Sequence, residues 1–171
     1  MEKLKVVLIL GLVFLGGAFN CFLGQTLFIN EVASNETLEG IDENGDASDW
    51  FEIYNSSEQA ISLDGFSFTD DISEPYKWVL EDGEIDPGGF LVVFASGKDR
   101  QDGELHTSFG LDSDGEALWM LDGDGGIVDF VHFDDMTTGK TFGRLTDGQL
   151  YMILEHPTPG STNNVNDAVD S

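Results

Sequence analysis

The sequence predicts an all-β protein, and three observations lead to this prediction. Apolar and polar residues alternate over short runs, as in Trp50-Phe51-Glu52-Ile53-Tyr54-Asn55. Turn-forming residues, above all Asp-Gly and Pro-Gly pairs, separate these runs at short intervals. After residue 24, no run of apolar residues follows the i, i+3, i+4 spacing of a helix. About seven to nine short strands with regular turns are typical of a β-sandwich.

The first half of the domain contains five predicted strands. Leu27 and Ile29 are the apolar positions of the first strand, and polar residues stand between them. In the second strand Phe51 and Ile53 share one face, while Trp50, Glu52 and Tyr54 share the other. Turn residues such as Asp64-Gly65 separate the later strands. The five strands are predicted over residues 26–34, 50–55, 60–63, 66–69 and 76–80.

The second half contains four more predicted strands. Residues 90–95 form a continuous apolar run, which predicts a central strand buried on both faces. The runs at 117–121 and 127–133 flank Asp122-Gly123-Asp124-Gly125-Gly126, and this pattern predicts a hairpin. The last strand, 151–154, ends before Pro157-Thr158-Pro159-Gly160, because proline cannot donate a hydrogen bond to a sheet.

Residues 1–24 are expected to be a secretory signal peptide and to lie outside the fold. Lys3 and Lys5 precede an apolar run of about ten residues, which is too short to cross a bilayer. Cleavage after Ala18 and cleavage after Gly24 are both compatible with the small residues there. Cys21 is the alternative lipid-anchor site, although Asn20 replaces the small residue that normally precedes a lipidated cysteine. A retained membrane anchor is the third alternative.

One domain is expected over residues 25–164, followed by a disordered polar tail over 165–171. Cys21 is the sole cysteine of the chain, so the mature domain has no disulfide within the chain to stabilise it. This lack is one reason to consider a bound metal.

The chain is strongly acidic, with 33 acidic and 7 basic residues and a formal net charge of −26. Removal of residues 1–24 takes away Glu2, Lys3 and Lys5 and makes the remainder slightly more acidic. Nucleic-acid binding depends on Lys and Arg to neutralise phosphates, so no nucleic-acid partner is expected. An acidic surface suits divalent cations, basic partners or simple solubility outside the cell.

The loop before the second strand carries oxygen-bearing side chains at the spacing of a calcium loop. Asp42, Asn44 and Asp46 stand two residues apart, and Asp49 can complete the set of ligands. Calcium takes about six to eight oxygen ligands, often from a loop of this kind. The loop is not an EF-hand, because Ala47 and Ile53 replace its glycine and its bidentate glutamate. An ordinary turn, which also favours Asp, Asn and Gly, is the competing interpretation.

The sequence gives few signs of a catalytic site. His106, His132 and His156 do not have the short spacing of zinc ligands, and His106 is interpreted as a structural histidine. Ser96-Gly97 follows a strand, but no base stands near it in the sequence, and there is no Gly-x-Ser-x-Gly motif. Pairs of carboxylates for glycoside hydrolysis stay open, because the chain is so rich in acids.

Three tryptophans and one arginine have alternative roles. Trp50, Trp78 and Trp119 can stack on sugars if they share an exposed face. Arg144 is expected to pair with a carboxylate on a strand and to fix the last turn.

Several ordered motifs resemble the lamin tail domain family in its bacterial secreted form. Each motif is weak alone, but their number and order over Leu27–Asn164 make the resemblance strong. The motifs are Ile29-Asn30-Glu31-Val32, Gly45-Asp46-x-x-Asp49-Trp50-Phe51-Glu52-Ile53-Tyr54-Asn55, Leu63-x-Gly65-Phe66-x-Phe68-Thr69-Asp70-Asp71, Lys77-Trp78, Pro87-Gly88-Gly89-Phe90-Leu91-Val92-Val93, Leu105-His106-Thr107-x-Phe109-x-Leu111, Gly115-Glu116-Ala117, Gly143-Arg144, Asp147-Gly148 and Thr158-Pro159-Gly160.

This resemblance implies an immunoglobulin-like sandwich and a binding or structural role. It also implies that Trp50 and Trp78, which lie in core motifs of the family, are buried. We therefore expect a secreted, non-enzymatic module with a protein or glycan partner at the cell exterior. The spacing of the oxygen-bearing side chains in the loop adds the expectation of Ca²⁺ at Asp42, Asn44, Asp46 and Asp49. One alternative is a metal-dependent extracellular hydrolase acting on phosphoesters or polysaccharide. Another is a carbohydrate-binding module.

Overall fold

The computed structural model describes residues 24–35, 37–38 and 40–163. The predicted signal peptide, except for Gly24, and the predicted tail lie outside these residues. Within them the chain forms 11 strands and no helix, which confirms the all-β prediction. This part of the chain therefore contains no helix that is long and apolar enough to cross a membrane.

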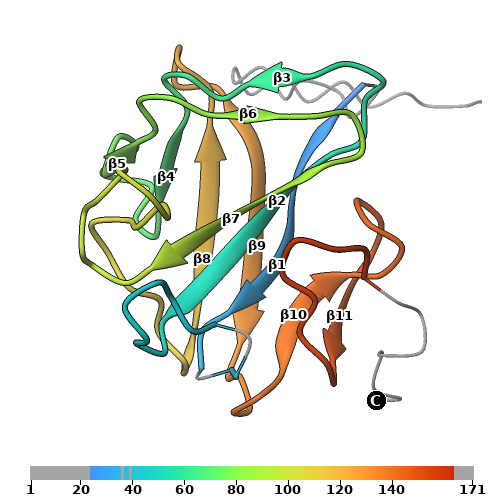
Figure 1. The fold of residues 1–171 in the computed structure, drawn as a ribbon. Helices are drawn as coiled ribbons and strands as arrows, with labels where there is room; N and C mark the ends of the chain where they lie inside the picture. Colours follow the sequence, from blue (N-terminus) through green and yellow to red (C-terminus); the bar gives the residue numbers. More distant parts are fainter. Residues whose placement is uncertain (1–23, 36, 39, 164–171) are drawn as a thin grey trace, which may run out of the picture.

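The larger sheet has five strands in the order β11-β10-β1-β2-β7, and all neighbours are antiparallel. Figure 1 shows β10 and β11 to one side of β1, with β2 and β7 to the other. The strands are β1 (Leu27–Ala33), β2 (Asp49–Asn55), β7 (Phe90–Ala95), β10 (Thr141–Arg144) and β11 (Tyr151–Leu154).

The second sheet has four antiparallel strands in the order β5-β4-β8-β9. Its strands are β4 (Ser67–Thr69), β5 (Trp78–Val79), β8 (Gly115–Leu121) and β9 (Ile127–Asp134). The turn at 122–126 joins β8 to β9, which confirms the predicted hairpin. A third pair, β3 (Ile61–Ser62) and β6 (Glu84–Ile85), lies at one end of the sandwich (Figure 1).

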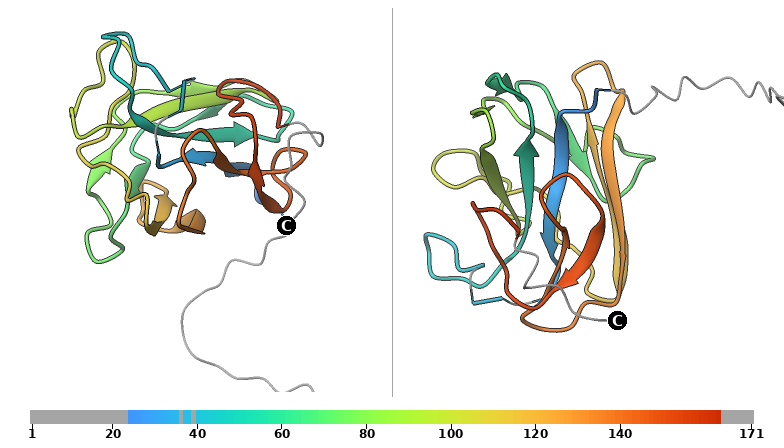
Figure 2. Two further views of the ribbon diagram at one scale, coloured as in Figure 1. Left: turned by 90° about the horizontal axis from the view of Figure 1, so that it is seen from below. Right: turned by 90° about the vertical axis from the view of Figure 1, so that its right-hand side faces the viewer.

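The two main sheets pack face to face and enclose one apolar core, as expected for an immunoglobulin-like sandwich (Figure 2). β1 and β2 supply Ile29, Val32, Phe51 and Ile53 to this core, and β8 and β9 supply residues from the opposite side. Burial of each such side chain contributes about 1.5–3 kcal/mol. The opposing core residues include Phe68, Trp78, Leu118, Met120, Val131 and Phe133.

The outer face of the larger sheet is also covered, and this arrangement positions the polar clusters described below. Glu31 is opposite Glu52, and Ala33 is opposite Trp50, so these four side chains share the face that points away from the core. Trp50, Ala33 and Phe94 form a second, smaller apolar cluster there. Loops cover this cluster, since the Trp50 indole N–H donates to Thr37 Oγ1 at 3.1 Å.

The structure corrects the prediction for residues 90–95. β7 is an end strand of the larger sheet, not a central one, and Phe90, Leu91 and Val92 are only half-buried. An irregular segment lies along the edge of β7 that faces away from β2. There Phe94 N donates to Leu105 O, and Thr107 N donates to Phe94 O. Val93 and Ala95 are buried in the main core, and Phe94 is buried in the cluster on the outer face.

Two strands were missed by the sequence analysis. β6 has two residues and lies among turn signals, so no alternation marks it. β10 has four residues, one of them Gly143, and it is recognised only through its pairing with β1 and β11.

Candidate functional site

The acidic loop forms a tight turn around the Asp42 carboxylate. Asp42 Oδ1 accepts hydrogen bonds from Asn44 N at 2.9 Å and from Asp46 N at 3.0 Å. The Asp42 side chain is fully buried, whereas the Asp46 side chain is 64% exposed. An aspartate that accepts from the backbone two residues later is the usual device for such a turn.

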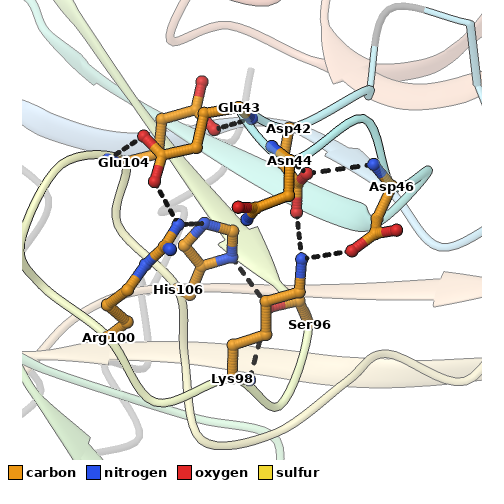
Figure 3. Close-up of polar contacts among 9 residues, drawn as sticks. All are labelled: Asp42, Glu43, Asn44, Asp46, Ser96, Lys98, Arg100, Glu104 and His106. Carbon is orange, nitrogen blue, oxygen red and sulfur yellow. Dashed lines mark hydrogen bonds and ion pairs between the residues drawn. The ribbon is translucent and has the colours of Figure 1, made fainter.

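A lysine ammonium lies between the two aspartates of this loop. Lys98 Nζ bonds Asp42 Oδ2 directly and reaches Asp46 Oδ2 at 2.8 Å (Figure 3). The hydrogen bond from Lys98, helped by the two backbone N–H groups, lowers the pKa of Asp42 to about 2 although burial opposes this. The same two aspartates raise the pKa of Lys98. A cation from the chain itself therefore neutralises the loop.

The four predicted calcium ligands have different surroundings in the structure. Asp42 and Asp46 share Lys98, and Asn44 contributes its backbone N–H to the turn. Asp49 is the first residue of β2, and its Oδ2 accepts from Leu111 N at 3.4 Å. Among the described residues, no three or more His, Cys, Asp and Glu side chains are grouped so that they could hold a metal ion. Calcium binding at this loop stays a prediction.

Next to this loop, a serine and a histidine from separate segments lie in contact. Ser96 Oγ is 2.8 Å from His106 Nδ1, although the sequence analysis found no base near Ser96. The ring stacks on Phe94 with 5.2 Å between centroids, and His106 is fully buried. His106 comes within reach because its segment runs along β7, and no local sequence pattern signals this pairing.

The second nitrogen of His106 determines the direction of the serine contact. Arg100 Nη2 is 2.9 Å from His106 Nε2, and a guanidinium can only donate. Nε2 must therefore accept, so the neutral ring carries its proton on Nδ1 and donates it to Ser96 Oγ. Burial, together with the nearby Arg100 and Lys98 charges, lowers the pKa of His106 and favours this neutral form. A histidine in this state cannot remove a proton from Ser96.

Arg100 connects the histidine to Glu43, and Glu43 in turn contacts Glu104. Its Nη2 is 2.5 Å from Glu43 Oε1, and Glu43 N donates to Glu104 Oε2 at 2.6 Å (Figure 3). Glu104 N in turn donates to Glu43 Oε2 at 3.3 Å. The contacts join the acidic loop to the 96–106 segment, and they confirm the interpretation of His106 as a structural histidine.

A second polar cluster lies under the C-terminal segment, defined here as residues 157–163. Glu31 accepts from the Thr158 hydroxyl at 2.8 Å, from Thr158 N at 3.2 Å and from the Thr141 hydroxyl. Glu52 accepts from Gly160 N at 2.5 Å and from Asn30 Nδ2 at 3.2 Å. Two neighbouring strands thus present carboxyl groups that hold one segment against the sheet.

The amide of Asn163 completes this attachment. Asn163 Nδ2 donates to Arg144 O at 2.9 Å and to Asn30 O at 3.2 Å, and Asn163 N donates to Asp147 Oδ1 at 2.9 Å. Burial raises the pKa of Glu52 to about 8, and the Glu31 and Asp147 charges add to the effect. Burial also raises the pKa of Glu31. Sequence analysis placed Glu31 and Glu52 in motifs but did not foresee their role.

Arg144 forms the pair that the sequence predicts. Its Nη2 lies 3.1 and 3.0 Å from the two Asp129 carboxylate oxygens, and its Nε donates to Ile29 O at 3.1 Å. The guanidinium also lies 4.2 Å from the centre of the Tyr151 ring. Burial nevertheless raises the pKa of Asp129. This pair ties β9 to β1 and β10.

The tryptophans do not form a shared exposed face. Trp50 and Trp78 are 0% and 2% exposed, as expected, and Trp119 on β8 is half-buried. Trp50 lies in the cluster on the outer face of the larger sheet, while Trp78 lies in the main core. Sugar stacking across these three rings is therefore not supported by their positions.

Comparison with models of protein families identifies a family that matches most of this chain. The model of the family described as Lamin Tail Domain matches residues 24–135. No curated protein matches the chain. β10 and β11 lie beyond the matched residues, yet both belong to the same sheet as β1 and complete it.

Proposed function

The chain belongs to the lamin tail domain family, and from this premise we propose that it acts as a non-enzymatic binding module outside the cell. The observation that supports the proposal is the use of its buried ionisable groups. Glu31 and Glu52 hold the C-terminal segment, Asp129 holds Arg144, and Asp42 holds Lys98. Each of these four buried carboxyl groups thus holds another part of the fold in place.

The Ser96–His106 contact supports the same proposal. A nucleophile and a base approach each other there, and their hydrogen bond runs from the histidine to the serine. An activated serine needs the opposite direction. The acidic surface, with a net charge of −26, suits partners that carry positive charge.

Export rests on the sequence of residues 1–24, with its basic start and its apolar run. The mass of the protein recovered outside the producing cell tests this part of the proposal. A mass for cleavage after Ala18 or Gly24 supports a secreted chain, and a lipid adduct on Cys21 indicates the anchored alternative. Recovery only inside the cell, with residues 1–24 retained, contradicts export.

Binding is tested by immobilising the folded chain and exposing it to the extracellular fraction of the producing cell. The matched control is the same chain after thermal unfolding. The expected result is a protein or glycan that the folded chain retains, and that binds saturably when purified. Saturable turnover of nitrophenyl phosphate or nitrophenyl glycosides by the purified chain with Mg²⁺, Zn²⁺ or Ca²⁺ contradicts the proposal and favours the hydrolase alternative.

We propose calcium as a ligand of the Asp42–Asp49 loop on the spacing of its oxygen-bearing side chains. The position of Lys98 sets a condition on this proposal. Its ammonium contacts Asp42 and Asp46, so calcium must displace it or bind beside it.

A further inference from the structure

The two main sheets of the sandwich have different numbers of strands, and this leaves part of the larger sheet uncovered. The larger sheet continues past β1 to β10 and β11, whereas the smaller sheet ends at β9. Figure 1 shows β10 and β11 beyond the edge of the smaller sheet. The position opposite β10 and β11, beside β9, therefore has no strand among the described residues.

The side chains at this position form a hollow. Val32, Phe142 and Ile153 lie directly opposite one another on β1, β10 and β11, so they share one face of the sheet. Val32 is in the core, but Phe142 is only half-buried and Ile153 is 45% exposed. The hollow is lined by His132, Phe133, Asp134, Asp135, Met136, Thr137, Phe142 and Ile153.

The backbone of β9 borders the same hollow. Among the strands of the described residues, β9 is the last of its sheet and pairs only with β8. Near its start, the Asp129 side chain accepts from Ile29 N at 2.8 Å and links β9 to β1. Further along, the edge runs beside the hollow from His132 to Asp134. The outer edge of such a strand offers N–H and C=O groups to an added strand.

The charge of the hollow and of the chain defines the kind of segment that fits. Asp134 and Asp135 are exposed at the hollow, His132 is the other titratable group of its lining, and the chain has a net charge of −26. The nearest cation in sequence, Lys140, is paired with Glu155 at 2.8 Å. A second copy of so acidic a chain is repelled, whereas Lys or Arg next to apolar residues complements the site.

We propose that the free edge of β9 binds an extended basic peptide segment of a partner protein. The segment adds a fifth strand to the smaller sheet, places apolar side chains on Phe142 and Ile153, and places Lys or Arg beside Asp134 and Asp135. This inference rests on the proposed binding function and names the chemical class of the partner.

The test uses three labelled peptides and the purified full chain. KVKVKVK provides alternating charge and apolar groups, KVKPKVK keeps its charge but has proline in the middle, and EVEVEVE reverses the charge. Fluorescence anisotropy measures their affinity, and amide chemical shifts locate the binding site. We expect KVKVKVK to bind, KVKPKVK to bind about tenfold more weakly because it loses a strand hydrogen bond, and EVEVEVE not to bind.

Two variants of the chain have matched controls. Ile153→Lys is expected to weaken binding of KVKVKVK about tenfold. Ile72→Lys, which changes an isoleucine of similar exposure in a loop away from β11, is expected to leave it unchanged. Asp134→Asn with Asp135→Asn is expected to weaken binding, while Asp82→Asn with Asp86→Asn is not. Chemical-shift changes are expected along 130–136.

Several outcomes overturn the inference. Equal affinity for KVKVKVK and KVKPKVK, or shifts spread over the acidic surface, indicates general charge attraction only. A dimer of the chain that Ile153→Lys disrupts indicates a second copy at this edge. If a partner captured from the cell exterior binds Ile153→Lys as well as the original chain, this inference fails while the proposed binding function stands.

Discussion

Glu31 and Glu52 lie directly opposite each other on β1 and β2, and both are completely buried. Their carboxyl groups hold the C-terminal segment through Thr158 and Gly160. Two negative charges in neighbouring buried positions repel each other, which adds to the effect of burial and favours the protonated form. This pair links the last described residues of the chain to the centre of the larger sheet, and it makes stability depend on pH.

We predict that the free energy of unfolding falls as the pH rises from 5 to 8. The pKa of Glu52 is raised to about 8 in the fold from an ordinary value of 4.5. The folded state then binds the proton more tightly than the unfolded state, so this stabilisation is complete below pH 4.5 and is lost as the pH rises through 8. One such group gives a slope of about −1.4 kcal/mol per pH unit. Urea unfolding at a series of pH values measures it.

Glu52→Gln provides the control, because glutamine does not titrate. The variant is expected to lose this part of the slope between pH 5 and 8, whatever its stability at one pH. Because the pKa of His106 is lowered in the fold, this residue contributes a slope of opposite sign. His106 is present in both the original chain and Glu52→Gln. The difference between their slopes therefore reports Glu52 together with its electrostatic effect on Glu31. An unchanged slope in the variant shows that Glu52 ionises normally in the fold.

We predict that Gly143→Ala destabilises the protein by about 1–3 kcal/mol, because the space above Gly143 is filled. An added Cβ lies 2.5 Å from Leu154 Cδ1, 2.9 Å from Asn163 Nδ2 and 3.3 Å from Glu31 Cγ. These atoms belong to β11, the C-terminal segment and β1, so the variant loosens their junction. Thermal unfolding measures the loss, and the Gly160 amide resonance reports whether the segment has moved.

Gly110→Ala is the matched control for this change. Its added Cβ meets only Ala95 O at 3.6 Å, an ordinary contact distance. We expect a change within about 0.5 kcal/mol. Equal losses in both variants contradict the packing argument at Gly143.

The strands that alternate clearly were predictable, and those defined by their partners were not. The Trp50–Asn55 run fixes β2 because Phe51 and Ile53 face the core, and the glycine-rich turn at 122–126 fixes the β8–β9 hairpin. β10 contains Gly143, where only glycine leaves room for Asn163 of the C-terminal segment and for Glu31 of β1. These neighbours are distant in sequence, so the local pattern does not signal them. The continuous apolar run of β7 suggested a central strand, but a loop covers it.

The same distinction applies to the polar clusters. The turn at Asp42 follows from local spacing, and the structure shows it. Lys98, by contrast, is 56 residues from Asp42, and His106 meets Ser96 only because its segment runs along β7. Long-range contacts of this kind depend on the order of the strands, which the residue pattern of one sequence does not specify. Arg144 was expected to find a carboxylate, but the sequence did not identify Asp129.

We predict that Arg144→Met costs about 3–5 kcal/mol at pH 7, because it leaves the buried Asp129 carboxylate without its cation. The loss is expected to be smaller near pH 4. The pKa of Asp129 is already raised by burial and rises further without Arg144, so the group is then protonated and needs no cation. Chemical unfolding at both pH values measures the difference.

Lys140→Met is the comparison for Arg144. It removes the more exposed Lys140–Glu155 pair, whose nitrogen and oxygen are 2.8 Å apart. Such a pair contributes less than about 1 kcal/mol. Similar losses in the two variants, or a loss for Arg144→Met that does not depend on pH, contradict the assigned role of Asp129.

We predict that calcium stabilises Lys98→Met more than it stabilises the original chain. Without calcium the variant is expected to be less stable, because the buried Asp42 side chain loses its cation. With millimolar calcium the ion meets Asp42 and Asp46 without competition from the ammonium. Calorimetric titration and melting temperatures with and without calcium measure both effects.

Lys77→Met, which removes a lysine paired with Asp70 at 2.5 Å, is the matched control and is expected to leave the calcium response unchanged. The absence of both heat and a melting shift in the original chain and in Lys98→Met removes calcium from the proposed function and leaves the loop as a turn neutralised by Lys98.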